Sequence, residues 1–555
     1  MGVMRMTEAG KIWTMDRRNF IKTGSLTGGM LLSGAGLTAL LDACSTSTPT
    51  SGGNGPKNTT MTFAVTDAPQ SFDADILAPG SQLAVLQCYE PLVDYAVGST
   101  NSSGARSIDA NKLQPRLAEA WTVSSDNLTW TFKLRQGVKS PMGNELTSDD
   151  VVWSFDKTRA QKRTGNFILN ASNVVSYQAL DKYTVQVVLS AANPFFLKAM
   201  TLYVPAIFDS TEVKKHVTAA DPFAINWIAQ NVAGYGPYMV ESASFGQQVT
   251  LVQNPNYYGK KPFFQKVLLQ QVPDPGSRQA LISSGQVDLV TDLTYAQSDE
   301  VRKSSKARVM EAVSNYQQRC IMNEKYPPFD NQLVRQAINY AVDHKAILAN
   351  LFGNKGGQMK SPVADVIPGH DGSFWHYETD ANKAKQLLAQ AGHGSGLDLT
   401  LEYSAQNWSD EQFAIQVQNS VKAAGINITL SKITNADMTA KTNLGARTIP
   451  FAVYYEQAIV LDPGYVFSLE SVPTGAGDRN ASNIPQLTAL TTQMNKMPDS
   501  SARAALVKQA QQIQVEDAGW MYGVEMVWQM ALGKGVTGWV WHPDNQPRLA
   551  DFTRT

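Results

Sequence analysis

The sequence predicts an α/β protein with more than one lobe, and three observations support this prediction. At 555 residues the chain exceeds what one compact core accommodates, so two or three lobes are expected. From about residue 380, helix and strand patterns alternate, which is typical of a separate α/β lobe. Upstream, short segments alternate apolar and polar residues as half-buried strands do.

Residues 16–44 combine a basic start, a glycine-rich apolar run and a final cysteine. The apolar part, Leu26 to Leu41, is shorter than the roughly 20 strongly apolar residues that a membrane-spanning helix needs. It also lacks an amphipathic period, which disfavours a first helix of the fold. The pair Arg17 and Arg18, followed by Asn-Phe-Ile-Lys, resembles a twin-arginine export signal, with a general secretion signal as the alternative.

The stretch Leu41 to Cys44 resembles a bacterial lipoprotein box, with Leu three residues before the cysteine and a small residue directly before it. Asp42 departs from the small or apolar residue usual at its place. Residues 45–60 are rich in Ser, Thr, Gly and Pro, which is typical of a flexible tether. We therefore expect a signal peptide over residues 1–44 and a lipid on Cys44 that anchors the folded part to a membrane.

The first half of the remaining chain is predicted to be rich in strands. Three of them are expected at residues 61–65, 128–135 and 183–190. A helix is expected over residues 83–95. Thr147 and Asp150 have the spacing of a capping box, which predicts the start of another helix.

The second half is predicted to be richer in helices. After a helix that ends at Gly285, one long helix is expected from Asp330, its cap, to Gly353, with one apolar face. The α/β part follows with elements at 381–391, 397–403, 409–425 and 426–433, where Ser409 and Gln412 are spaced as a capping box. A last helix over 501–517 precedes a β-like tail.

Composition and motifs exclude several classes of function. A formal net charge of -1 disfavours a general binder of nucleic acid or acidic lipid. No Cys or His spacing predicts a metal site, and Cys88 and Cys320 are expected to be small buried hydrophobes or, alternatively, a disulfide. Gly533–Gly538 spells GxGxxG, but Trp539 follows where a helix would be needed. We expect no catalytic residue, metal or cofactor.

Four motifs occur in order between residues 113 and 347. They are LQPRLAEAWTVSSDNLTWTFKLRQGVKSPMGNELTSDDVVWSFDK, GYGPYMVESASFGQQVTLVQNPNYYGKKP, ALISSGQVDLV and PPFDNQLVRQAINYAVDHKAI. Together they resemble the family 5 extracytoplasmic solute-binding proteins of peptide, nickel and opine ABC importers. Tyr258 stands where that family commonly has Trp. The resemblance extends over nearly the whole chain from residue 62.

The resemblance implies a two-lobed α/β fold of the type II periplasmic-binding-protein kind, in the large peptide-binding class, with mixed sheets and a discontinuous first lobe. Lobe I is expected over residues 61–318, with a β-rich subdomain at about 91–230, and again over 521–555. Lobe II is expected over 319–520. The chain would cross between the lobes near 319–323 and 520–524, where hinge closure around a ligand would occur.

The resemblance also indicates where a ligand would bind. Peptide-binding relatives hold the ligand's amino group with an acidic residue ahead of an Asp-Pro; here Asp462 and Pro463 match, and Glu456 is the nearest acidic substitute. Residues 399–412 contain no Arg or Lys, so no carboxylate clamp is expected there. We expect ligand contacts from Ser81, Gln82, Tyr403, Asn407, Trp408, Tyr454, Tyr455, Glu456 and Asp462. Such aromatic and amide groups suit sugar rings, peptides or cationic solutes.

The implied function is non-enzymatic capture of an oligopeptide or another small polar solute, such as an oligosaccharide, for delivery to the permease of an ABC importer. The protein is expected to be a monomer on the outer face of the cytoplasmic membrane or in the periplasm. Two alternatives stay open: a twin-arginine-exported cofactor enzyme, and a ligand-binding receptor subunit of a sensor.

Overall fold

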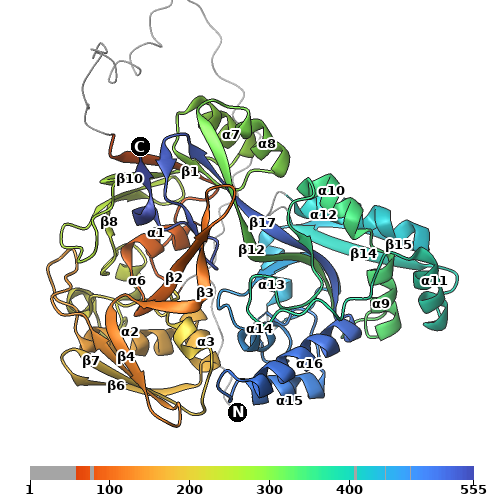
Figure 1. Cartoon of the computed structure of the whole chain (residues 1–555), viewed down its shortest axis with the longest axis horizontal. Coiled ribbons are helices and arrows are strands. Elements are labelled where there is room, and N and C mark those ends of the chain that lie inside the picture. The colour runs from red at the N-terminus through yellow and green to blue at the C-terminus, as the bar shows by residue number, and fades with distance from the viewer. Residues whose placement is uncertain (1–57, 76–79, 405–408, 444–445, 476) are drawn as a thin grey trace, which may run out of the picture. The chain divides into compact units, whose positions relative to one another are not determined.

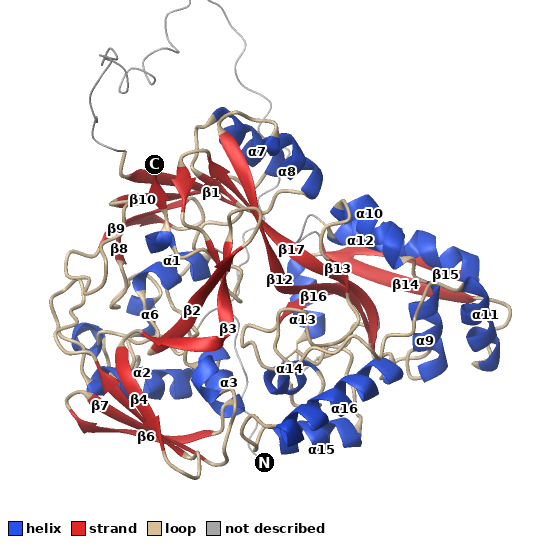
Figure 2. Cartoon of the chain, viewed as in Figure 1, coloured by secondary structure: helices blue, strands red, loops and turns tan. Residues whose placement is uncertain are grey.

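One mixed sheet runs through both lobes of this α/β protein (Figures 1 and 2). The computed structural model describes residues 58–75, 80–404, 409–443, 446–475 and 477–555, so Arg17, Arg18 and Cys44 lie outside the described residues. In spatial order the strands of the sheet are β15 (Ile426–Ile433), β14 (Leu397–Ser404), β16 (Phe451–Gln457), β12 (Ala307–Met322), β17 (Trp520–Gly533), β11 (Leu289–Val290), β1 (Thr60–Val65), β10 (Lys266–Gln271), β9 (Gln248–Gln253) and β8 (Tyr238–Ser244), with β13 (Gly357–Gln358) paired to β17 beside this order.

Three smaller sheets complete the described β structure. The strands of the largest are β4 (Ala118–Val123), β5 (Thr129–Leu134), β7 (Thr184–Leu189) and β6 (Val174–Asp181). The other two contain β19 (Val540–Trp541), β3 (Arg106–Pro115) and β2 (Val93–Thr100), and β18 (Val536–Thr537) with β20 (Thr553–Arg554). The predicted alternation holds in β5 and β7, where Phe132, Val185 and Val187 are buried and Lys133 is exposed.

The helices divide between the two lobes (Figure 2). Those of lobe I are α1 (Ser81–Cys88), α2 (Ser148–Gln161), α3 (Thr164–Ala171), α4 (Phe196–Ala199), α5 (Ser210–Val213), α6 (Ile225–Ile228), α7 (Pro275–Ser284) and α8 (Tyr295–Arg302). Those of lobe II are α9 (Gln332–Ala341), α10 (His344–Phe352), α11 (Ala381–Gln390), α12 (Asp410–Val421), α13 (Asn435–Thr442), α14 (Pro463–Glu470), α15 (Pro485–Met494) and α16 (Ser501–Asp517).

Several predicted helix ends are confirmed. The capping box of α2 forms, because the Thr147 amide donates to Asp150 Oδ2 at 2.8 Å. Gly285 ends α7 in the left-handed conformation, with a φ of 77° that favours glycine. The last helix spans Ser501–Asp517 as predicted.

Three details of the predicted helices are wrong. The helix expected over 83–95 ends at Cys88, because Pro91 restricts the residue before it and Val93 already begins β2. The long helix from residue 330 is two helices, capped by Asn331 and by Asp343, whose side chain accepts a hydrogen bond from the Ala346 amide. Ser409 precedes α12, but its side chain makes no capping hydrogen bond.

The lobe II part of the sheet is covered on both faces. One face packs against α9 to α12 through a cluster that includes Ile338, Leu388 and Val417. The opposite face packs against α13 and α16 through Met438, Val515 and Trp520. A sheet buried on both sides is the layered arrangement expected of an α/β lobe. Cys88 and Cys320 are buried free thiols.

A fully buried charge cluster joins α2 to the segment that follows β1. Lys157 Nζ donates to Asp73 Oδ1 at 2.8 Å and to Asp75 Oδ2 at 3.0 Å, and both ion pairs have side-chain exposures near zero. Although burial alone would raise it, the Lys157 ammonium holds the pKa of Asp73 below its ordinary value. The cluster therefore stabilises the fold only while its cation is present.

We predict that Lys157→Met lowers the free energy of unfolding by about 3–5 kcal/mol, because it leaves two buried carboxylates without a cation. Urea denaturation measures the change. Lys162→Met is the control, since Lys162 is exposed at the end of the same helix. Equal stability of both variants would contradict the prediction.

Candidate functional site

The candidate site lies where β12 and β17 pass between the lobes (Figure 1). Ala307–Val313 pairs with the C-terminal part of β17, and from Tyr316 onward β12 also pairs with β16. The β12–β17 register shifts between Val313 and Gln317 and again between Gln318 and Cys320. This interruption places a run of buried polar residues between the lobes, namely Ser314, Asn315, Gln317, Gln318 and Arg319.

A cavity of about 850 Å³ opens beside this crossing. One wall is the turn between β2 and β3 together with β3 itself, from Gly98 to Asn111, and the other is the loop 365–370. Val313 of β12, Leu461 and Trp541 complete the lining, and Val313 is 55% exposed. The cavity therefore receives residues from both lobes.

The lining of this cavity is acidic. Its described lining residues include Asp109, Asp365 and His370, and none of them is Lys or Arg. His370 Nε2 lies 2.9 Å from Asp365 Oδ1, and the Asp365 side chain is 67% exposed. Because two carboxylates face a space without basic side chains, the arrangement favours a cationic group or a hydrogen-bond donor.

Hydrogen bonds connect the loop 365–370 to the strands β12 and β17. The Asp365 amide donates to Glu525 Oε2 at 3.1 Å, and Gln317 Nε2 donates to Glu525 Oε1 at 3.1 Å. Burial raises the pKa of Glu525 from 4.5 to about 7. The position of one cavity wall thus depends on a buried carboxyl group of β17.

A row of aromatic rings lies on β16, β12 and β17. Tyr454 stacks on Tyr455 with a centroid distance of 5.8 Å, and Tyr455 stacks on Tyr316 at 4.8 Å. Trp528 lies 6.0 Å from Tyr316 in a tilted arrangement. Stacked rings of this kind provide flat apolar surface for a ligand or for packing.

Arg319 of β12, which pairs with Tyr454 of β16, forms a buried ion pair with Glu470, with Nη2 2.6 Å from Oε2. Its guanidinium also lies 3.7 Å from the centroid of the Trp520 ring. Burial raises the pKa of Glu470 to about 7 even though Arg319 opposes the shift. Glu456 lies 4.0 Å from Arg479, whose guanidinium is 5.2 Å from the centroid of the Tyr454 ring.

The segment 457–462 is held from the other lobe. Lys198 Nζ donates to the Leu461 carbonyl at 3.0 Å, and the Leu461 amide donates to Tyr95 Oη at 3.3 Å. Asn545 Nδ2 donates to Gln457 Oε1 at 2.6 Å. These contacts connect the end of β16 and the segment before α14 to lobe I.

The residues predicted to contact a ligand occupy several places. Tyr454, Tyr455 and Glu456 follow one another in β16, and Tyr403 is buried in β14. Ser81 is buried in α1, where its Oγ accepts hydrogen bonds from the amides of residues 70 and 71, and Gln82 beside it is half-buried. Asn407 and Trp408 lie outside the described residues.

Asp462 is occupied by protein partners. Its Oδ1 accepts hydrogen bonds from the Gly464 amide at 2.8 Å and from Arg503 Nη2 at 2.6 Å, and the residue is 1% exposed. It therefore caps α14 and neutralises a buried guanidinium. None of the seven predicted contacts that the structure describes is among the residues that line the cavity between the lobes.

The segments that line the cavity were not among the predicted ligand contacts. Residues 98–111 are rich in Ser, Asn and Gly, and residues 365–370 contain Asp, Pro, Gly and His. Such compositions predict loops, but they do not indicate which loops meet. The run of polar residues around Asn315, inside β12, was the available signal for the crossing.

Within the described residues, no helix combines the length and apolar character needed to cross a bilayer. The same part of the chain contains no group of three or more His, Cys, Asp or Glu side chains placed to hold a metal ion.

Comparison with known proteins identifies relatives of this chain. Residues 112–478 match the model of the family described as bacterial extracellular solute-binding proteins, family 5. The chain is 28% identical over 481 residues to the probable D,D-dipeptide-binding periplasmic protein DdpA of Escherichia coli, covering 86% of this chain and 90% of that protein. It is 25% identical over 511 residues to heme-binding protein A of Haemophilus influenzae, covering 88% and 90%.

A solved structure shares the fold. The periplasmic binding protein DppA of Helicobacter pylori, in complex with the peptide STSA, superposes with a TM-score of 0.78 at 22% identity. The match covers 89% of this chain and 98% of that one.

We predict that Glu525→Gln becomes more stable relative to the parent protein as the pH rises from 5 to 8. The pKa of Glu525 is higher in the folded state, so the parent's free energy of unfolding falls as the pH rises through about 5 to 7. The variant does not titrate there, and the difference should change by up to about 3 kcal/mol. Urea denaturation at several pH values measures it. Loss of the hydrogen bond from the Asp365 amide changes the variant's free energy of unfolding equally at every pH. A stability difference between variant and parent that does not vary with pH would therefore contradict the raised pKa of Glu525.

Proposed function

The chain belongs to the family 5 bacterial extracellular solute-binding proteins, and on this basis we propose that it captures a small polar solute between its lobes for an ABC importer. The observation that carries the proposal is the cavity lined by the β2–β3 region and the loop 365–370. Its relatives include proteins named for binding dipeptides and heme. This chain has two lobes joined by the paired strands β12 and β17, and it superposes on a solved periplasmic binding protein.

We further propose that the solute carries a cationic or amino group, as an oligopeptide does at its N-terminus. The acidic lining supports this, because Asp109 and Asp365 face the cavity without a basic neighbour among its described lining residues. The absence of Arg and Lys from residues 399–412 disfavours recognition of a free carboxylate there. A neutral oligosaccharide, bound by the aromatic row and amide groups, is the second class to test.

Binding, with no chemical conversion of the solute, is the proposed activity. Incubation with peptides, oligosaccharides and amine-bearing metabolites should raise the melting temperature according to RT ln(1 + [L]/Kd). Mass spectrometry of the same mixtures should return the solute unchanged. Turnover, or a stoichiometric redox cofactor in the purified protein, would favour the twin-arginine-exported enzyme instead. Binding without interaction with a permease would favour the sensor subunit.

We predict that Asp109→Asn and Asp365→Asn each weaken binding of a cationic solute roughly fivefold, corresponding to about 1 kcal/mol, because each removes one partly exposed charge. Isothermal titration calorimetry measures the affinity. Asp330→Asn is a matched control, since Asp330 is exposed and does not line the cavity. Equal affinity in all three variants would remove the acidic wall from the binding site.

We propose that the protein is exported by its twin-arginine signal and held at the outer face of the membrane by a lipid on Cys44. Arg17, Arg18 and the Ser/Thr-rich tether after Cys44 support this. A monomer attached to the membrane through this flexible tether reaches a permease in the same membrane.

We predict that Cys44→Ala moves the protein from the membrane fraction to the soluble fraction outside the cytoplasm, because the lipid attachment site is lost. Fractionation and immunoblotting measure the distribution. Cys88→Ala is the control, since Cys88 is buried in the fold and should leave the protein in the membrane fraction. Retention of Cys44→Ala in the membrane would refute the anchor. Replacing Arg17 and Arg18 together by Lys should retain the protein in the cytoplasm.

A further inference from the structure

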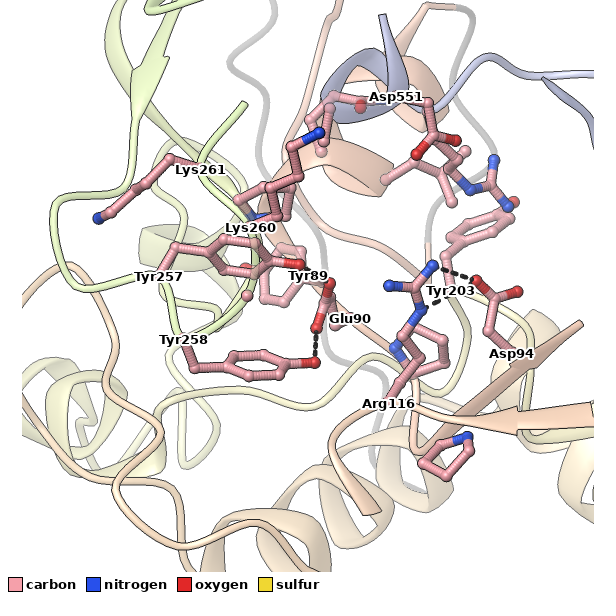
Figure 3. A pocket seen from close by; sticks show the side chains of 18 of the residues that line it. Tyr89, Glu90, Asp94, Arg116, Tyr203, Tyr257, Tyr258, Lys260, Lys261 and Asp551 are labelled. Carbon is pink, nitrogen blue, oxygen red and sulfur yellow. Dashed lines mark hydrogen bonds and ion pairs between the residues drawn. The ribbon is translucent and has the colours of Figure 1, made fainter. Parts of the chain in front are cut away.

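A second cavity, of about 560 Å³, lies within lobe I (Figure 3). It is formed by the end of α1 and the start of β2, the loop after β9 and the C-terminal residues around Asp551. In Figure 3, Tyr257 and Tyr258 lie on one side, Arg116 and Asp94 on the other, and Glu90 between them. The described lining residues of the two cavities do not overlap: Arg106 lines this one, and the next residue, Ser107, lines the cavity between the lobes.

The lining has an excess of positive charge. Six of the lining residues are basic and three are acidic. The basic ones are Arg106, Arg116, Arg135, Lys260, Lys261 and Arg548, and the acidic ones are Glu90, Asp94 and Asp551. This balance is opposite to that of the solute cavity, although the whole chain has a formal charge of only -1. A local excess of one charge in a concave site attracts ligands of the other sign.

Two of the three acidic side chains already accept hydrogen bonds from protein groups, and the third ionises less readily than usual. Glu90 accepts one hydrogen bond from the Tyr257 hydroxyl and another from the Tyr258 hydroxyl, each at 2.5 Å. Asp94 Oδ2 accepts from Arg116 Nε at 3.1 Å and from Nη2 at 2.9 Å. Burial raises the pKa of Asp551, which reduces its negative charge. The carboxylates therefore offer little to a bound cation.

Several basic groups, in contrast, are free to bind. Among the described residues, the Nη atoms of Arg135 and the Nζ of Lys260 have no hydrogen-bond or ion-pair partner, and Arg116 uses Nε and Nη2 but not Nη1. The Arg135 guanidinium is oriented by two contacts, a bond from Nε to the Arg116 carbonyl and the Tyr258 ring 5.7 Å away. A guanidinium held in this way is pre-organised for an oxyanion.

We propose that this lobe I pocket binds a small organic anion, a carboxylate or a phosphate ester, independently of the solute held between the lobes. The oxyanion contacts Arg135, Lys260 and the free Nη1 of Arg116. The rings of Tyr257 and Tyr258 cover the apolar body of the ligand. The pocket lies apart from the crossing strands, so occupancy does not require the lobes to close.

Calorimetric titration of the full chain with benzoate and, separately, with inorganic phosphate tests the proposal at constant ionic strength. We expect saturable binding of one equivalent, with a dissociation constant in the millimolar range or tighter. Lys260→Gln and Arg135→Gln should each weaken it roughly fivefold, as loss of one charged donor does. Lys133→Gln is the matched control, because Lys133 is exposed on the same strand, β5, as the segment leading to Arg135 and lies outside the pocket. Lys260 is exposed, so its variant is expected to fold.

The two probes separate the ligand classes: benzoate alone indicates a carboxylate with an apolar body, and phosphate alone indicates a phosphate ester. Failure of both to saturate overturns the proposal, as does equal weakening by Lys133→Gln. Asp109→Asn should leave anion binding unchanged; if it strengthens binding, the anion occupies the cavity between the lobes and the lobe I pocket is refuted. Loss of solute binding with anion binding retained would refute the proposed function alone.

Discussion

The pairing of β12 with β17 is the constraint on which the two-lobed arrangement depends. Both strands extend through both lobes, so each lobe's part of the sheet is attached to the other by backbone hydrogen bonds. Where the pairing is interrupted, buried backbone groups need other partners, since water is excluded there. Ser314 Oγ donates to the Met526 carbonyl at 2.5 Å and meets this need. The same interruption concentrates polar side chains beside the solute cavity, so the position of the site follows from the geometry of the sheet.

Charge is distributed unevenly around this frame. The cavity between the lobes has acidic residues and no basic one among its described lining residues, whereas basic side chains predominate in the lobe I pocket. A net charge of -1 for the whole chain conceals this separation. If both proposals hold, cationic and anionic groups are sorted to different pockets by electrostatics alone, without any steric discrimination. The buried carboxyl group of Glu525 links the first of these environments to the strand pairing.

Local sequence patterns predicted the features that depend on near neighbours in the chain. The capping box of α2 and the left-handed Gly285 are set within a few residues, and both are present. The break between α9 and α10 was missed because the apolar period continues through it, although Asp343 provides a second cap. The cavity could not be predicted from such patterns, because its walls meet across more than 250 residues of sequence, from Ser99 to Asp365. The resemblance to a family led to the Asp-Pro of residues 462 and 463, but the geometry assigns Asp462 to Arg503, a partner that only the folded chain brings near.

The amide side chain of Asn315 holds two segments that are distant in the sequence next to each other. Asn315 Nδ2 donates to the Ala458 carbonyl at 2.8 Å and to the Pro543 carbonyl at 2.9 Å; the first acceptor follows β16 and the second follows β19. The side chain is 1% exposed, so water does not replace either acceptor in this buried position. A movement that separates these two segments breaks at least one of the two bonds, and water then hydrates the freed donor. Asn315 therefore favours conformations in which the segment after β16 and the C-terminal tail stay together.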